Sequence, residues 1–114
     1  MLARLSIPLT IALACGVLAA SAWASSTRGV GLHDNYITFT SGSAPHGTIT
    51  FNVRNHGLNT HTFNIKRIST GNVLYQSARL GPGTTLSVTR TLKAGTYRIY
   101  CTIHAGMHKI FTVT

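Results

Sequence analysis

The sequence predicts an all-β chain that folds as an antiparallel sandwich or barrel. Apolar residues alternate with polar ones in short runs rich in threonine, and nowhere does a helical period persist for the length of a helix. Turn-forming residues such as glycine, proline and asparagine separate the runs at the short intervals typical of a sandwich. The length of 114 residues fits one small domain with a small core.

Each expected strand is recognised by two or three apolar residues in alternation. β-Branched and aromatic side chains at such positions favour strands over helices. In chain order, the expected strands contain Ile37 and Phe39; Ile49, Phe51 and Val53; Phe63 and Ile65; Leu86 and Val88; Tyr97 and Ile99; and Phe111 and Val113. The turns expected between them are Ser41–Gly47, Asn55–Gly57, Gly71–Asn72, Gly81–Gly83 and Ala94–Gly95, and Ser25–Thr27 is expected to be a short lead-in.

Residues 1–24 have the composition of a secretory signal peptide. Arg4 is their only charge, an apolar stretch runs from Ile7 to Ala20, and Ala22-Trp23-Ala24 has the small-x-small form that signal peptidase cleaves. A retained membrane anchor is an alternative, although the apolar stretch is short for a span. A lipoprotein attached through Cys15 is another.

Cleavage after Ala24 would leave a periplasmic or secreted domain over residues 25–114. This product has 90 residues, a formal charge of +8 instead of +9, and one cysteine, Cys101. Thiols in an oxidising compartment tend to be paired. An unpaired Cys101 is therefore better interpreted as a metal ligand or a reactive group than as a structural residue.

Residue types that bind metals lie close together near the C-terminus. Cys101, His104 and Met107 have the spacing Cys-x-x-His-x-x-Met, on a short turn between two expected strands. Upstream, His61 is in phase with the apolar residues of its expected strand, so it should project inward, as Cys101 does from its own. Two imidazoles, a thiolate and a thioether suit both Cu(I) and Cu(II). Zinc is the competing metal, but zinc sites seldom use methionine.

These motifs resemble those of the cupredoxins, or type 1 blue copper proteins. The short loop from Cys101 to Met107 is most similar to that of amicyanin, because plastocyanin and pseudoazurin have more residues between the histidine and the methionine. The resemblance covers the whole of the chain after the signal peptide. Its other parts are the Gly47–Asn55 strand, the His61-x-Phe63 step, the Gly81-Pro82-Gly83 turn and the Gly95–Cys101 segment.

The resemblance implies a Greek-key β-sandwich that holds one copper ion. It implies His61, Cys101 and His104 as equatorial ligands and Met107 as the axial ligand. It also implies one-electron transfer as the activity, with the loop residue His104 as the ligand whose edge reaches the surface. Small or apolar residues should surround this electron port, with Ala105, Gly106 and Leu58 as candidates.

The sequence departs from the family pattern at two places. Thr62 stands where an asparagine commonly hydrogen-bonds the cysteine loop, and a hydroxyl could do this with a different reach. The run His108-Lys109-Ile110 replaces a glycine common after the methionine. We expect His108 to be a solvated residue that opens the last strand, with ligand exchange as the alternative. His33, His46 and His56 fall near turns and are expected in solvent, a looser copper-capturing surface being the alternative.

The charge balance of ten basic residues to one acid indicates an acidic or anionic partner. The bases are spread along the chain, which argues against nucleic acid. The nine that follow the predicted signal peptide are Arg28, Arg54, Lys66, Arg67, Arg79, Arg90, Lys93, Arg98 and Lys109. We expect a monomer that docks an acidic redox protein near His104 or associates peripherally with an anionic membrane surface. The alternative is that the positive charge only keeps the protein soluble.

Three other functions compete with electron transfer. A Cys-His nucleophile would need an orienting group, and the only acid, Asp34, is far from the cluster in sequence, so an enzyme is not expected. A copper delivery or storage protein would exchange the ion instead of the electron. A binding accessory that has lost redox use is disfavoured by the complete set of four ligands.

Overall fold

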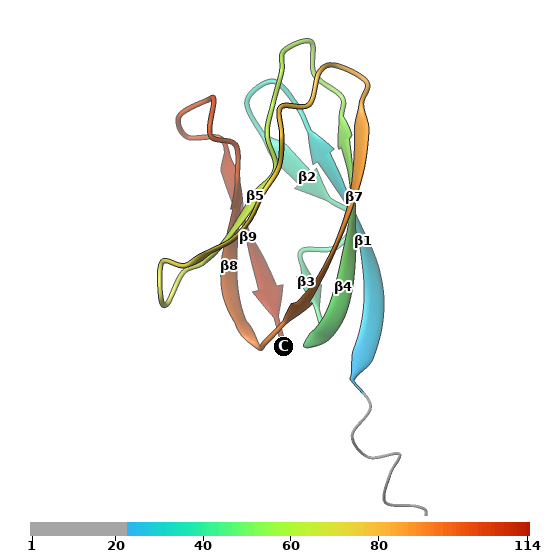
Figure 1. Ribbon diagram of the computed structural model, residues 1–114, viewed down its shortest axis with the longest axis vertical. Coiled ribbons are helices and arrows are strands. Elements are labelled where there is room, and N and C mark those ends of the chain that lie inside the picture. Colours follow the sequence, from blue (N-terminus) through green and yellow to red (C-terminus); the bar gives the residue numbers. More distant parts are fainter. Residues whose placement is uncertain (1–22) are drawn as a thin grey trace, which may run out of the picture.

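The computed structural model describes residues 23–114, which fold into two packed β-sheets (Figure 1). The strands are β1 (Ala24–Leu32), β2 (Ile37–Phe39), β3 (Ser43–Ala44), β4 (Gly47–Asn55), β5 (Asn64–Arg67), β6 (Val73–Gln76), β7 (Thr85–Leu92), β8 (Gly95–Tyr100) and β9 (His108–Val113). The predicted all-β Greek-key sandwich is confirmed. The predicted signal peptide lies outside the described residues except for Trp23 and Ala24, and Cys15 lies outside them as well.

One sheet has the strand order β2-β1-β4-β7, and the other has the order β3-β9-β8-β5-β6. Most neighbours are antiparallel, as expected. However, β1 runs parallel to β4, and β3 runs parallel to β9. Both sheets are therefore mixed, in contrast to the purely antiparallel arrangement that the turns suggested.

The core between the sheets is built from the alternating apolar residues of the expected strands. Phe51 in β4 packs against Phe111 in β9, with ring centroids 5.3 Å apart, and against Phe63, with centroids 5.7 Å apart. All three rings are completely buried. Removing these apolar surfaces from water holds the two sheets together and fixes the ends of the strands that carry the loops.

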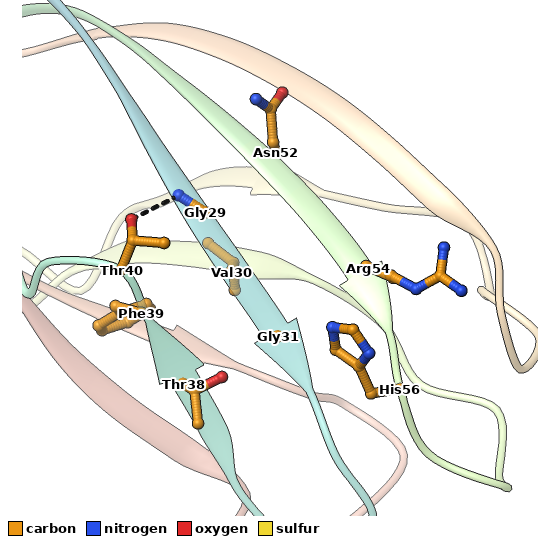
Figure 2. Close-up of a pocket in the computed structure, with 9 residues that line it drawn as sticks. All are labelled: Gly29, Val30, Gly31, Thr38, Phe39, Thr40, Asn52, Arg54 and His56. Atoms are coloured by element: carbon orange, nitrogen blue, oxygen red, sulfur yellow. Dashed lines mark hydrogen bonds between the residues drawn. The ribbon is translucent and has the colours of Figure 1, made fainter.

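The prediction that Ser25–Thr27 is a short lead-in is wrong, because these residues belong to strand β1. It pairs with β4 along its whole length, from Ala24 opposite Gly47 to Leu32 opposite Asn55. Only Val30 and Leu32 of this strand enter the core, and Gly29 and Gly31 lie on its opposite face, where a Cβ at Gly29 would lie 2.8 Å from Cγ2 of Thr40. The missing side chains leave a hollow over β1, β2 and β4 (Figure 2), where the Gly29 N–H donates to Thr40 Oγ1 at 2.9 Å.

Two short strands, β3 and β6, lie at the edges of the second sheet and were also not expected. Strand β3 falls within the predicted turn Ser41–Gly47 and pairs with β9. Strand β6 pairs with β5 across a register shift between Ile65 and Lys66, and most of its side chains are exposed. Strand β3 buries only Ala44 and strand β6 only part of Tyr75, so these short edge strands carry little apolar alternation.

Three of the connections at one end of the sandwich, the upper end in Figure 1, surround the predicted site. They are the β1–β2 turn at residues 33–36, the β4–β5 connection at 56–63 and the β8–β9 loop at 101–107. Every residue predicted to bind copper lies in the second or third of these. Within residues 23–114, no helix is long and apolar enough to cross a membrane.

Candidate metal centre

His61 lies just before β5, and its side chain points into the protein. Strand β5 begins at Asn64, so His61 is outside the strand in which its phase was predicted. A bridge to Leu80 replaces the strand: the His61 N–H donates to the Leu80 carbonyl at 3.0 Å, and the Leu80 N–H donates to the His61 carbonyl at 2.8 Å. The inward direction expected for His61 is confirmed, because the residue is completely buried.

Cys101 follows the last residue of β8 and begins a tight loop. The Cys101 N–H donates to the Met107 carbonyl at 3.0 Å, and the Met107 N–H donates to the His104 carbonyl at 3.2 Å. Gly106 has a φ of 84°, a left-handed conformation that favours glycine. Backbone hydrogen bonds within the loop therefore fix the positions of the cysteine and the histidine.

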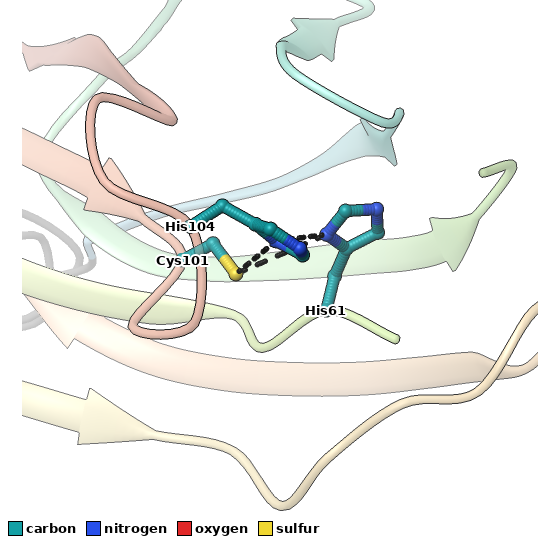
Figure 3. Close-up of side chains that lie close together, drawn as sticks. All are labelled: His61, Cys101 and His104. Carbon is teal, nitrogen blue, oxygen red and sulfur yellow. Dashed lines mark hydrogen bonds between the residues drawn. The ribbon is translucent and has the colours of Figure 1, made fainter. Parts of the chain in front are cut away.

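The two connections bring His61, Cys101 and His104 together (Figure 3). Nδ1 of His61 lies 3.1 Å from Nδ1 of His104. Cys101 Sγ lies 3.9 Å from the first of these nitrogens and 3.7 Å from the second. Ligand atoms that each lie about 2.0–2.3 Å from a shared ion are separated by about 3–4 Å. The three donors are thus spaced to hold one metal ion.

Met107 is part of the same loop, and its side chain is almost completely buried, with 2 % exposed. It lines a shallow hollow together with Cys101 and His104. The sequence places a thioether next to a thiolate and two imidazoles, a donor set that copper accepts in both oxidation states. The residues present therefore fit copper, and the axial role of Met107 stays a prediction.

Thr62 connects the His61 segment to the cysteine loop. Its backbone N–H donates to Cys101 Sγ at 3.4 Å, and its hydroxyl lies 3.7 Å from the same sulfur. The Thr102 N–H donates to Thr62 Oγ1 at 2.9 Å, and Asn64 Nδ2 donates to the same oxygen at 2.9 Å. The structure thus places the Thr62 hydroxyl where the sequence suggested, as the group that binds the loop in place of an asparagine.

The surroundings of Cys101 favour its ionised form. Burial alone would raise the pKa of the Cys101 thiol, but N–H groups of Thr62 and Ile103 and the rings of His61 and His104 outweigh it. Together they lower the pKa to about 6 from an ordinary value of 9.0. A thiolate is the form that binds metal and the form that copper needs.

Asp34 is the residue of this site that the sequence did not reveal. Its Oδ1 lies 3.0 Å from His61 Nε2, on the side of the ring opposite the other two donors. Donation from the backbone N–H groups of Leu58 and Asn59, and then from His61, lowers the pKa of Asp34 to about 2. Separation by 27 residues hides this contact; the one usable signal was that Asp34 is the only acidic residue in the sequence.

The other described histidines lie apart from the three donors. His108 is exposed as the first residue of β9, as expected. His46 and His56 are exposed as well. His33 is only half-exposed, because its ring stacks between Tyr36, with centroids 4.4 Å apart, and His56, with centroids 5.2 Å apart.

Comparison with known proteins identifies the family. The model of the cupredoxin-like domain matches residues 6–113, nearly the whole chain. The chain is a member of the cupredoxin family. A search of curated proteins finds no significant match. Copper is the cofactor that this family and the His, Cys and Met donors of the cupredoxin site indicate.

Solved structures with the same fold are numerous but distant in sequence. Reduced auracyanin from Roseiflexus castenholzii is 22 % identical with a TM-score of 0.63; the match covers 82 % of this cupredoxin and 99 % of auracyanin. Auracyanin A, a blue copper protein of Chloroflexus aurantiacus, is 20 % identical with a TM-score of 0.62 over 80 % and 100 % of the two chains. A variant of amicyanin is 18 % identical with a TM-score of 0.58 over 75 % and 80 %. These similarities show the shared fold.

Proposed function

We propose that this cupredoxin is an exported one-electron carrier with a type 1 copper site. The observation that carries the proposal is the convergence of His61, Cys101 and His104, whose donor atoms lie 3.1 to 3.9 Å apart. Together with Met107 they would hold one copper ion. When bound, copper supplies one-electron chemistry by cycling between Cu(II) and Cu(I).

The hydrogen bonds of the site favour exchange of an electron over exchange of the ion. His61 is held by the bridge to Leu80, and the Cys101 sulfur accepts hydrogen bonds from Thr62. Donors held in this way by the protein rearrange little when the charge of the ion changes. Little rearrangement means a low barrier to electron transfer, while release of the ion would require these contacts to open.

His104 is the proposed electron port. Its side chain is half-buried, whereas His61 is completely buried. Ala105 and Gly106 beside it are exposed, and Leu58 on the neighbouring connection is 86 % exposed. Small and apolar residues of this kind allow a partner to approach closely, and an exposed leucine offers apolar area for docking.

A basic rim next to this port favours an acidic redox protein as the partner. Lys66 and Arg98 pair across β5 and β8, and both line the hollow that contains the copper loop. Lys66 Nζ lies 5.3 Å from the centre of the Tyr100 ring, and His108 completes the rim. Positive charge at a docking site steers an acidic partner and weakens with salt. We propose docking as a monomer, with an anionic membrane surface as the competing site of attachment.

Stopped-flow kinetics would test the proposed carrier role. The copper-loaded 25–114 domain should exchange electrons with an acidic small cytochrome faster than it gives up copper to a chelator. The rate should fall with salt, and Arg98→Gln should reduce both the rate and its salt dependence. Arg90→Gln is the matched control, because Arg90 is exposed on β7 in the other sheet. If copper transfer to the chelator is faster than electron exchange, the copper-delivery alternative is favoured.

A further inference from the structure

The single acidic residue of the sequence contacts a completely buried ligand histidine. Asp34 lies in the β1–β2 turn and is about one-third exposed, at 34 %. Its carboxylate accepts the Leu58 N–H at 2.9 Å and the Asn59 N–H at 3.1 Å, besides facing His61 Nε2 at 3.0 Å. These contacts join the β1–β2 turn to the connection that carries His61.

The surrounding chain is arranged so that this contact can form. A Cβ at Gly57 would overlap Asp34 Oδ1 and would lie 2.9 Å from His61 Nε2, so only glycine leaves room. The buried Asn55 holds the same connection in place. Its Oδ1 accepts the Gly57 N–H at 2.8 Å, and its Nδ2 donates to the Asn59 carbonyl at 2.8 Å.

We propose that Asp34 is a positioning residue that fixes the tautomer of His61 and lowers the reduction potential of the copper site. A carboxylate on Nε2 keeps the ring proton there. Nδ1 of His61 then presents its lone pair to the space shared with Cys101 and His104. The part of this proposal that concerns the potential rests on the proposed function, whereas the part that concerns the tautomer needs no metal.

The effect on the potential follows from charge. Reduction moves one electron from the reduced partner to Cu(II) and gives Cu(I), with no bond in His61 made or broken. A nearby negative charge stabilises the more positive Cu(II) state more than Cu(I). Asp34 is the only carboxylate side chain of the sequence. Its partial burial limits screening by water.

The potential is tested by comparing Asp34→Asn with a matched control, Asn35→Lys. Both substitutions raise the net charge by one at the same turn, but Asn35 is exposed, and the side chain that contacts His61 is that of Asp34. We expect Asp34→Asn to raise the equilibrium constant for reduction at least about tenfold, equal to 59 mV for one electron. Asn35→Lys should change it less than about threefold. Equal shifts in the two variants would overturn the proposal.

The tautomer is tested on the copper-free protein. Ring ¹⁵N chemical shifts at pH 8 should show that the single ring proton of neutral His61 lies on Nε2 in the natural protein. In Asp34→Asn they should show a mixture of the Nδ1–H and Nε2–H tautomers. Gly57→Ala serves as a second variant, because it retains the carboxylate but separates it from the ring, and it should produce the same mixture. An unchanged tautomer in a folded variant would overturn the proposal. A natural protein that lacks the blue copper signal would refute the proposed function, but the tautomer result would still stand.

Discussion

The two imidazoles of the copper site occupy different surroundings. His61 is completely buried, its backbone bridges to Leu80, and its two ring nitrogens face His104 and Asp34. His104 is half-buried on a loop, and within residues 23–114 its ring forms close polar contacts through Nδ1 alone. One histidine is thus fixed by the sandwich, and the other lies where the site meets solvent.

This difference suggests a division of roles between the ligands. A ligand held on both ring nitrogens fixes the orientation of the donor set, and it contributes to stability as well as to metal binding. A ligand with a free edge at the surface can connect the metal to a partner. The two roles place opposite demands on burial, so they fall on different residues.

Removal of each imidazole should have the largest effects and should separate the two roles. His61→Gly and His104→Gly should each weaken copper binding by more than about 100-fold, because each removes a ligand and not only an outer partner. Added imidazole should restore the visible spectrum of His104→Gly, since solvent reaches that position. It should not restore His61→Gly, where the space is enclosed.

Titration with imidazole, followed by visible absorption, measures this contrast. Dissociation of the copper is monitored in parallel, so that loss of metal is distinguished from loss of a ligand. Equal rescue of the two variants would contradict the assigned difference in access.

Thr62→Val should have a smaller effect, on stability. The substitution removes the hydroxyl that accepts from Thr102 N–H and Asn64 Nδ2, and Thr62 is buried. We expect the free energy of unfolding of the copper-free protein to fall by about 1–3 kcal/mol, because two donors lose their acceptor. Urea unfolding provides the measurement. Thr112→Val, at an exposed position of β9 away from the cysteine loop, is the control and should cost about 0.5 kcal/mol or less.

Acid should reveal a still smaller contribution, from Asp34. The pKa of Asp34 in the folded protein is about 2, below its ordinary value of 3.8. A lowered pKa means that the folded state favours the ionised form, so the stabilisation is complete above about pH 4 and is lost as the pH falls towards 2. Since no other acidic side chain exists in the sequence, Asp34→Asn should flatten this part of the stability curve. An identical slope in urea unfolding of both proteins between pH 4 and 2 would contradict the assignment.

The strands that the sequence revealed are those with one buried face. Phe51 and Val53 in β4, or Tyr97 and Ile99 in β8, alternate because every second residue enters the core. Strand β1 was not predicted because it contributes only Val30 and Leu32 to the core, and Gly29 and Gly31 provide no side chains on its other face. Its partner β4 lies beyond two other strands in the chain, so local spacing gave no further sign.

The site divides in the same way between what is local and what is distant. Cys101, His104 and Met107 belong to one loop, and their spacing was sufficient to predict a metal site there. His61 could be included in the predicted ligand set because it alternates with the apolar Phe63, although the structure holds it by a bridge instead of a strand. Asp34 could not be added, because its contact with His61 depends on how the two sheets bring separate turns together.

The visible and electron paramagnetic resonance spectra of the Cu(II)-loaded 25–114 domain test the central claim most directly. The account predicts an intense blue thiolate-to-copper charge-transfer band and the narrow copper hyperfine splitting of a covalent copper–sulfur bond, both lost in Cys101→Ser. A pale protein with a weak spectrum that Cys101→Ser leaves unchanged would contradict it.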